Sequence, residues 1–220
     1  MPAKPRPHSG GEGADSPQTP RPRPSARSIR SGHDDLGVEV QGGRVGNERS
    51  LTMPTAESGG RPIGTPTTPQ PGDDGSVRRS LELESETAIL LADRGYRVHL
   101  NPSKSEVAEA RLATGDSGNP LKNPDYLIEG RVFDCYAPTE PAKNVRGIHW
   151  EVKNKVVTKR QTQRVVVNLA DWAGDMVALR KQFADWPIEG LKELKAITPA
   201  GDLVQIDLPS SPTESVRRGD

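Results

Sequence analysis

The order of apolar and polar residues predicts a folded region in the second half of the chain, starting with a helix. From Ser80 to Gly95, apolar residues recur at helical spacing. This pattern predicts a helix over 81–94, with Ser80 as its N-cap and Gly95 just past its end. Residues 96–100 alternate between polar and apolar and predict a short strand, and residues 103–119 predict a weak helix followed by a loop.

The middle of this region predicts a hairpin, a helix and a buried strand. Two short strands over 123–138 flank a tight turn at Glu129-Gly130. Apolar positions over 145–159 repeat every three to four residues and predict a helix, although a glycine and several valines there weaken the pattern. The run RVVVNL at 164–169 is continuously apolar and β-branched, which is typical of a strand buried on both faces.

The last part of the region predicts one more helix and a closing hairpin. The helix covers 175–186 and ends before a proline, and the hairpin covers 191–208 around the turn PAGD. The order is helix, strand, strand, strand, helix, strand, helix, strand, strand, with a further weak helix after the first strand. This order indicates an α/β (α+β) domain with a mixed sheet and helices on its faces.

Composition separates this domain from its flanks. Residues 1–80 contain 12 prolines and 13 glycines, and all eight aromatic residues of the chain lie at or after Tyr96. A stretch of that kind cannot bury enough apolar surface to offset the entropy lost on ordering. We therefore expect a disordered tail over 1–79, one domain over 80–208, and a second disordered tail over 209–220.

Net charge and cysteine content exclude several classes of protein. The 30 basic and 30 acidic residues balance, so net charge selects no partner. The single cysteine, Cys135, excludes an intrachain disulfide and a cysteine-rich zinc site. No apolar run has the length of a membrane helix, and no signal peptide is visible at the N-terminus. We expect a soluble protein that reaches any site outside its own cell by an unidentified route.

Two aspartates in the predicted hairpin are candidate metal ligands. If the turn centres on Glu129-Gly130, Asp125 and Asp134 pair across the two strands and their carboxylates converge. Two such carboxylates repel one another unless a cation lies between them, and Mg²⁺ or Mn²⁺ prefers oxygen ligands of this kind. In the alternative interpretation, Asp125 is a turn residue after a proline and Asp134 is a charge on an edge strand.

A glutamate and a lysine on the neighbouring helices are further candidates. Glu86 borders the apolar side of the helix at 81–94, although most helical glutamates only face solvent. Lys155 borders the apolar stripe of the helix at 145–159 and could reach the sheet to contact a phosphate. Lys153 competes with Lys155 for this role, and helical geometry separates the two by about 200°.

The segment from Lys143 to Arg164 carries a local excess of positive charge. It contains seven basic residues and one acidic residue, Glu151. Such an excess attracts a polyanion through counterion release, although a solvated basic helix face is the alternative interpretation. Trp150 in the same segment could stack on a base or pack in the core. The candidates for nucleic-acid binding are Arg146, Lys153, Lys159, Arg160 and Arg164.

These segments together resemble a known family. The stretches SETAILLADRGYRV, NPDYLIEGRVFDCYAP, NVRGIHWEVKNKV and RQTQRVVVNLADW resemble the C-terminal toxin nuclease of contact-dependent growth inhibition proteins, the CdiA-type tRNA nuclease domain. The resemblance covers residues 80–207. It implies a variant of the PD-(D/E)xK nuclease fold, in which the core order is helix, three strands, helix, strand.

The resemblance also implies roles for individual residues. Glu86 matches the helical acid of the family, Asp125 and Asp134 match its two strand aspartates, and Lys155 matches its lysine. In the wider superfamily the lysine follows the strand acid by two residues, a place that Tyr136 occupies here.

The resemblance implies a metal-dependent endoribonuclease toxin that cleaves tRNA with Mg²⁺, Mn²⁺ or Zn²⁺. It also implies a cognate immunity protein and delivery into the cytoplasm of a target cell. A nuclease of the same fold that acts on DNA, and a non-catalytic module that binds RNA or protein, remain as alternatives.

Overall fold

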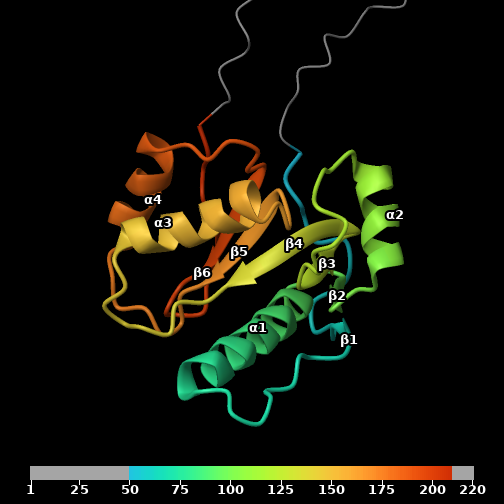
Figure 1. Ribbon diagram of the computed structural model, residues 1–220, viewed down its shortest axis with the longest axis horizontal. Helices are drawn as coiled ribbons and strands as arrows, with labels where there is room; N and C mark the ends of the chain where they lie inside the picture. The colour runs from blue at the N-terminus through green and yellow to red at the C-terminus, as the bar shows by residue number, and fades with distance from the viewer. Residues whose placement is uncertain (1–49, 210–220) are drawn as a thin grey trace, which may run out of the picture. The chain divides into compact units, whose positions relative to one another are not determined.

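The computed structural model describes residues 50–209, which form a seven-stranded mixed sheet with helices on both faces (Figure 1). The strands lie in the sheet in the order in which they occur in the chain. They are β1 (Ile63–Gly64), β2 (Val98–Leu100), β3 (Tyr126–Ile128), β4 (Arg131–Tyr136), β5 (Arg164–Asn168), β6 (Glu193–Ile197) and β7 (Leu203–Gln205).

Four α-helices and a π-helical turn connect these strands, and the predicted mixed α/β architecture is confirmed. The α-helices are α1 (Gly75–Asp93), α2 (Lys104–Thr114), α3 (Val145–Lys153) and α4 (Met176–Asp185), and the π-helical turn η1 (Asn154–Thr158) continues directly from α3. No helix among residues 50–209 is both long and apolar enough to cross a membrane.

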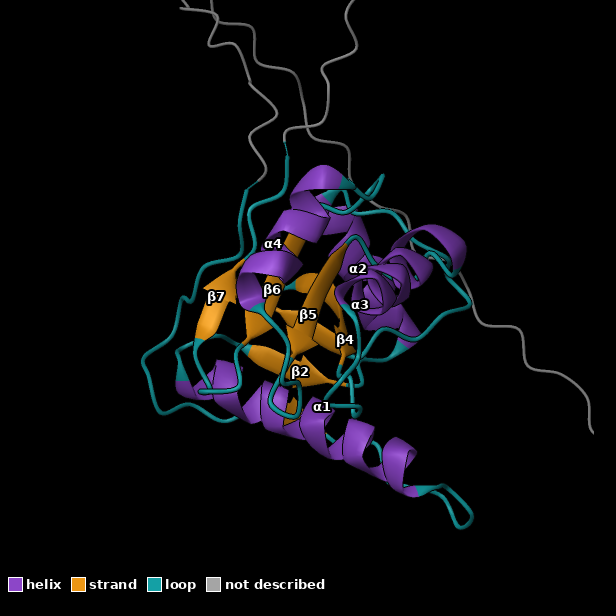
Figure 2. Ribbon diagram, turned by 90° about the vertical axis from the view of Figure 1, so that its left-hand side faces the viewer, coloured by secondary structure: helices purple, strands orange, loops and turns teal. Residues whose placement is uncertain are grey.

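The connections determine which face each helix covers. Strands β4, β5 and β6 are parallel neighbours, joined first through α3 and η1 and then through α4. Successive right-handed crossovers that move in one direction along a sheet place their helices on the same face. Helices α3 and α4 accordingly lie together on one face, and α1 lies on the opposite face (Figure 2).

Two apolar clusters hold these layers together. The larger cluster joins α3, α4 and the facing side of the sheet, and includes the fully buried Ile148, Val165 and Leu194. The second cluster packs α1 against the other side of the sheet through residues such as Leu91 and Phe133. Strand β5 contributes to both clusters and is buried along its whole length, as the continuous apolar run predicts.

The predicted hairpin turn is confirmed, and the helix predicted to be weak has a well-defined start and end. The hairpin turn is formed by Glu129 (φ 50°) and Gly130 (φ 71°), both in the left-handed region that a two-residue hairpin loop requires. Ser103 and Glu106 form a capping box at the start of α2, and Gly115 ends that helix at φ 69°.

The start of α1 and the start of the domain differ from the prediction. Asp74, and not Ser80, is the N-cap of α1, because its carboxylate accepts hydrogen bonds from the backbone N–H groups of Ser76 and Val77. Residues 50–79 also belong to the fold, since β1 pairs with β2 and α1 begins at Gly75. The predicted boundary at residue 80 is therefore wrong. Residues 1–49 and 210–220, where the rest of the predicted tails fall, lie outside the described residues.

Polar contacts bind the segment before β1 to the domain. Thr52 donates from its backbone N–H (3.0 Å) and its hydroxyl (2.7 Å) to the two carboxylate oxygens of Glu193. Thr55 binds Glu129 in the same way, at 3.1 and 2.6 Å. Arg131 donates to the backbone oxygen of Ser50 at 2.7 Å. We call residues 50–55 with these contacts the N-terminal strap.

Candidate active site

The candidate site lies where β3 ends and β4 continues. The register pairs Tyr126 with Phe133, so the next pair along the same ladder is Asp125 and Asp134. Beyond that pair β4 loses β3 as a neighbour, and the Asp125 side chain takes the place of the missing strand. Its Oδ2 accepts a hydrogen bond of 2.7 Å from the backbone N–H of Cys135.

Lys155 reaches this point from η1, the segment that leads into β5, and β5 pairs with the other edge of β4. Its Nζ donates a hydrogen bond to Oδ1 of Asp134, and its side chain is 17% exposed, whereas that of Asp134 is fully buried. Lys155 lies in the π-helical turn η1, and single π-helical turns frequently occur at functional sites. Lys153, the competing candidate, is exposed. The structure therefore brings Asp125, Asp134 and Lys155 together.

The helical acid at this site is Glu84. Burial, followed by the negative charge of Asp134, raises the pKa of Glu84 to about 7. Glu86 is instead paired with Arg79 at 3.1 Å and has a side chain that is 53% exposed. The prediction that Glu86 is the helical acid of the site is therefore wrong, because its side chain is directed to Arg79 and solvent. Glu84 lies four residues before the buried Ala88, one helical turn away, and this spacing was a usable signal.

The site contains more carboxyl groups than ammonium groups, and this imbalance shifts their pKa values. Burial, and then the charge of Asp134, raises the pKa of Asp125 well above its ordinary value. Burial lowers the pKa of Lys155, but the charges of Asp134 and Asp125 outweigh it and raise that pKa above its usual value. Three carboxyl groups, those of Glu84, Asp125 and Asp134, thus lie near one ammonium, that of Lys155.

These residues fit a divalent cation of the Mg²⁺ or Mn²⁺ type. The donor set consists of carboxylate oxygens, and Oδ2 of the fully buried Asp134 has no hydrogen-bond partner among residues 50–209. Within the same residues, no three His, Cys, Asp or Glu side chains are placed to hold a metal ion by themselves. Mg²⁺ is commonly held by one or two carboxylates, with water and substrate phosphate completing its shell. Asp125 and Asp134 match that arrangement.

The predicted nucleic-acid-binding residues divide into two groups. The exposed members lie along α3, η1 and the turn that follows, and they are Arg146, Lys153, Lys159 and Arg160. Trp150 is 58% exposed and lies on the same helix, which removes core packing as its role.

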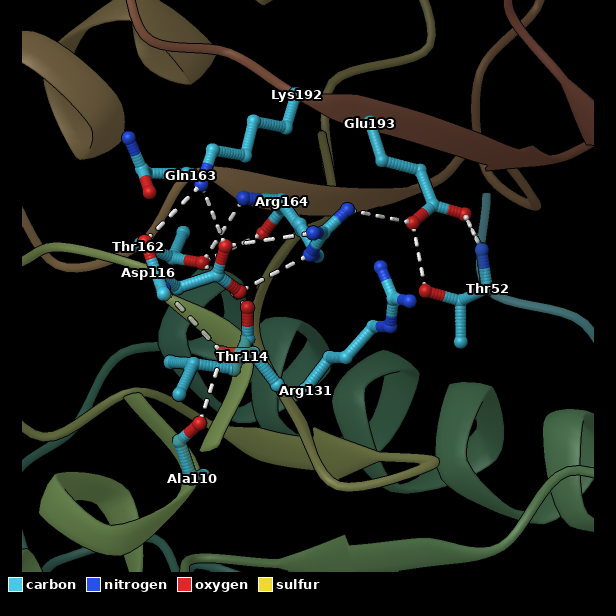
Figure 3. A network of polar contacts seen from close by, with 12 residues as sticks. Thr52, Ala110, Thr114, Asp116, Arg131, Thr162, Gln163, Arg164, Lys192 and Glu193 are labelled. Carbon is cyan, nitrogen blue, oxygen red and sulfur yellow. Dashed lines mark hydrogen bonds and ion pairs between the residues drawn. The ribbon is translucent and has the colours of Figure 1, made fainter. Parts of the chain in front are cut away.

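Arg164 does not belong with them, and its prediction as a nucleic-acid-binding residue is wrong. Only 5% of this residue is exposed, because it lies inside a buried ion network (Figure 3). Its guanidinium group pairs with Asp116 at 3.1 Å and with Glu193 at 3.1 Å. Lys192 and Lys195 complete the network, at 2.8 Å from Asp116 and 3.0 Å from Glu193, respectively.

Replacing Glu84 with glutamine is expected to remove part of the pH dependence of stability. The folded chain raises the pKa of Glu84 from 4.5 to about 7, so the folded state holds the proton more tightly than the unfolded state does. The stabilisation is complete below pH 4.5 and is lost as the pH rises through about 7. Above that pH, Glu84→Gln should be more stable than the wild type by about 1–3 kcal/mol.

Chemical denaturation between pH 5 and 8, with a chelator present, measures this difference. Glu86→Gln is the matched control, because it removes the same charge from an exposed position on the same helix. Equal pH dependence in the wild type and in Glu84→Gln would contradict the placement of Glu84 beside Asp134.

Comparison with known proteins identifies relatives of this chain. Residues 122–203 match the family described as the contact-dependent growth inhibition CdiA C-terminal domain. The chain is 35% identical over 183 residues to the tRNA nuclease CdiA-2 of Burkholderia pseudomallei strain 1026b. That alignment covers 83% of this chain but only 5% of the relative.

A solved structure also has a similar fold. It is described as a CdiA-CT/CdiI toxin and immunity complex from Burkholderia pseudomallei, and its matching chain is 36% identical to this one. The TM-score is 0.55, and the match covers 67% of this chain and 99% of the other.

Proposed function

The chain belongs to the family of CdiA C-terminal toxin domains, and from this premise and the geometry of its site we propose that it is a metal-dependent endoribonuclease toxin that cleaves tRNA. The observation that carries the proposal is the convergence of Asp125, Asp134 and Lys155 at the point where β3 ends and β4 continues. The identity of the substrate is supported by the relative that is named a tRNA nuclease.

The residues of the site have distinct parts in the proposed reaction. Asp125 and Asp134 would hold the divalent cation, which supplies charge neutralisation at the phosphate and an acidic bound water. The Lys155 ammonium stabilises the negative charge that grows on the phosphate oxygens. Glu84 has a pKa of about 7, which is suited to accepting and returning a proton near neutral pH.

The fold supports assignment to a variant of the PD-(D/E)xK superfamily. Apart from α2, which is inserted between β2 and β3, the order α1, β2, β3, β4, α3, β5 reproduces the core order of helix, three strands, helix, strand. Tyr136 occupies the usual place of the lysine, and Lys155 supplies the ammonium from η1 instead. In this proposal the catalytic chemistry of the superfamily is retained although one residue comes from a different element.

Two further features of the proposal concern partners and delivery. The solved relative is a toxin and immunity complex, which supports a cognate immunity protein for this chain. Membership of a growth-inhibition toxin family supports delivery into a target cell, with the tRNA of its cytoplasm as substrate.

A cleavage assay with total tRNA and with plasmid DNA tests the proposal. After chelation the protein should be inactive, and Mg²⁺ or Mn²⁺ should restore cleavage of tRNA, with Zn²⁺ less effective because it favours nitrogen and sulfur ligands. Cleavage that survives chelation would end the metal-dependent version. Intact tRNA beside degraded plasmid would show that the enzyme acts on DNA.

The basic surface of α3 and η1 is expected to bind the RNA backbone. Arg146 and Lys153 flank the exposed Trp150 at helical spacings of four and three residues, so all three lie on one face of the helix. A cationic groove with an aromatic ring is typical of single-stranded RNA binding. Removing both charges in an Arg146→Gln, Lys153→Gln double variant should weaken tRNA binding and reduce the slope of log K against log salt by about 1.4–1.8.

Filter binding of tRNA at several salt concentrations measures this effect. The control is an Arg97→Gln, Lys104→Gln double variant, which removes the same net charge from exposed positions outside α3 and η1. An equal loss of affinity and slope in this control would show that the surface acts only through net charge.

A further inference from the structure

A hollow lies beside the acid cluster, between the N-terminal half of α1 and the loop that follows β4. Its volume is about 190 Å³, and its lining includes Ser76, Ser80, Tyr136, Glu140 and Lys143. None of these residues belongs to the carboxylate and lysine set described above. The hollow is therefore a separate polar feature next to the proposed site of cleavage.

Two rows of side chains lead from the acid cluster to this hollow. Ser80 precedes Glu84 by one helical turn on α1, so the two lie on the same face of that helix. Tyr136 follows Asp134 by two residues on β4, so the two point to the same side of the sheet. An RNA strand has a nucleotide on each side of the bond that is cut. The two rows give a strand whose phosphate lies at Asp134 a path to the hollow.

The fold holds Lys143 at this position. The indole Nε1 of Trp172 donates to the backbone oxygen of Lys143 at 2.6 Å, which fixes the loop. A Cβ at Gly147 would lie 3.1 Å from Cε of Lys143, so the glycine leaves room for the lysine stem. A side chain at this position would require the lysine stem to shift by a few tenths of an ångström.

The Lys143 ammonium retains capacity to bind an anion. Its one ion pair among residues 50–209 is with Glu140, at 3.8 Å, which is longer than a hydrogen bond. The Glu140 side chain is 74% exposed and is free to turn into solvent, whereas that of Lys143 is 28% exposed. Lysine is a common phosphate binder in proteins, acting as a point charge.

We propose that this hollow is a substrate subsite, in which Lys143 binds the phosphate of a nucleotide adjoining the cleaved bond and the Tyr136 ring lines the space for its base or ribose. The proposal rests on the proposed RNA nuclease function and adds a second anchoring point to it. It also gives Glu140 a role, because this carboxylate competes with the phosphate for Lys143.

Binding of intact tRNA to the Asp134→Asn protein tests the subsite without cleavage. Adding Lys143→Gln should weaken binding about tenfold and reduce the slope of log K against log salt by about 0.7–0.9, the value for one lost phosphate contact. Adding Glu140→Gln should change affinity in the opposite direction. The matched control is Lys104→Gln, an exposed lysine on α2, which should bind within twofold of its parent.

The outcomes separate this subsite from the proposed function. If Lys143→Gln and Lys104→Gln give the same affinity and salt slope, the subsite is wrong, whether or not the wild type cleaves tRNA. In the active protein, Lys143→Gln should raise KM about tenfold and leave kcat within threefold, and a lowered kcat with unchanged KM would overturn the proposal. If the wild type leaves tRNA intact while the Asp134→Asn variants bind it as expected, the nuclease proposal fails and the binding subsite remains.

Discussion

Asp134→Asn is expected to reduce the rate of tRNA cleavage by about a thousandfold or more, which is the scale seen when a central electrostatic group of an active site is removed. Asparagine has nearly the same shape but lacks the charge that pairs with Lys155 and would bind the cation. Asp134 is fully buried, with one oxygen on Lys155 and the other without a partner within residues 50–209. Single-turnover cleavage of tRNA with saturating Mg²⁺ measures the loss.

Two controls make this result specific to the site. Glu86→Gln is the same chemical change on an exposed side chain bound to Arg79, and it should cleave within about twofold of the wild type. Lys155→Met should lose activity on a scale similar to Asp134→Asn, because the two groups act as one unit. Full activity in Asp134→Asn, with the variant shown to be folded, would mean that cleavage does not depend on the site formed by Asp125, Asp134 and Lys155.

Arg164→Met is expected to lower the free energy of unfolding by about 3–5 kcal/mol, because it leaves buried carboxylates without their central cation. Both partners of Arg164, Asp116 and Glu193, are buried, and the arginine itself is 5% exposed. Methionine fills the volume but donates no hydrogen bond. Urea denaturation monitored by tryptophan fluorescence measures the change.

Arg146→Met is the matched control for this experiment. Arg146 is exposed on α3, so its replacement should change stability by less than about 0.5 kcal/mol while weakening tRNA binding. The two arginines thus have opposite expected effects on stability and binding. A stable Arg164→Met protein with weakened tRNA binding would restore the original interpretation of Arg164 as a nucleic-acid contact.

The parts of the site that the sequence predicts are those fixed by local geometry. The turn at Glu129-Gly130 sets the register of the hairpin, and the register alone places Asp125 opposite Asp134. Likewise, the apolar stripe that includes Val152 directs Lys155 toward the sheet. The register of the hairpin is fixed within one turn, whereas the choice of Lys155 over Lys153 also depends on the π-helical turn η1, which the pattern does not predict.

The errors arose where a residue's environment depends on distant segments. Glu86 is the exception, because helical spacing alone distinguishes it from Glu84, which lies one turn before the buried Ala88, whereas Glu86 is exposed and paired with Arg79. Arg164 begins a buried strand, and its burial depends on Asp116 and Glu193, which are distant in the chain. Sequence periodicity contains no information about such partners.

The beginning of the domain was missed for a similar reason. The stretch around β1 is rich in proline and glycine and has no aromatic residue, so its composition favours disorder. Its order comes from polar contacts with residues far along the chain, such as the bonds of Thr52 to Glu193. Composition measures the apolar burial available to a segment, and this segment is held by hydrogen bonds instead.

The N-terminal strap also determines how the domain responds to mechanical force. Tension applied at residue 50 loads the contacts of Ser50, Thr52 and Thr55 before it reaches α1 or the central strands. These contacts follow one another along the chain, so they break one at a time. Each step therefore needs less force than breaking all of them together. Traction from this end would break the contact of Ser50 with Arg131 and then detach Thr52 from Glu193, the carboxylate that neutralises Arg164 and Lys195, and so loosen the buried ion network.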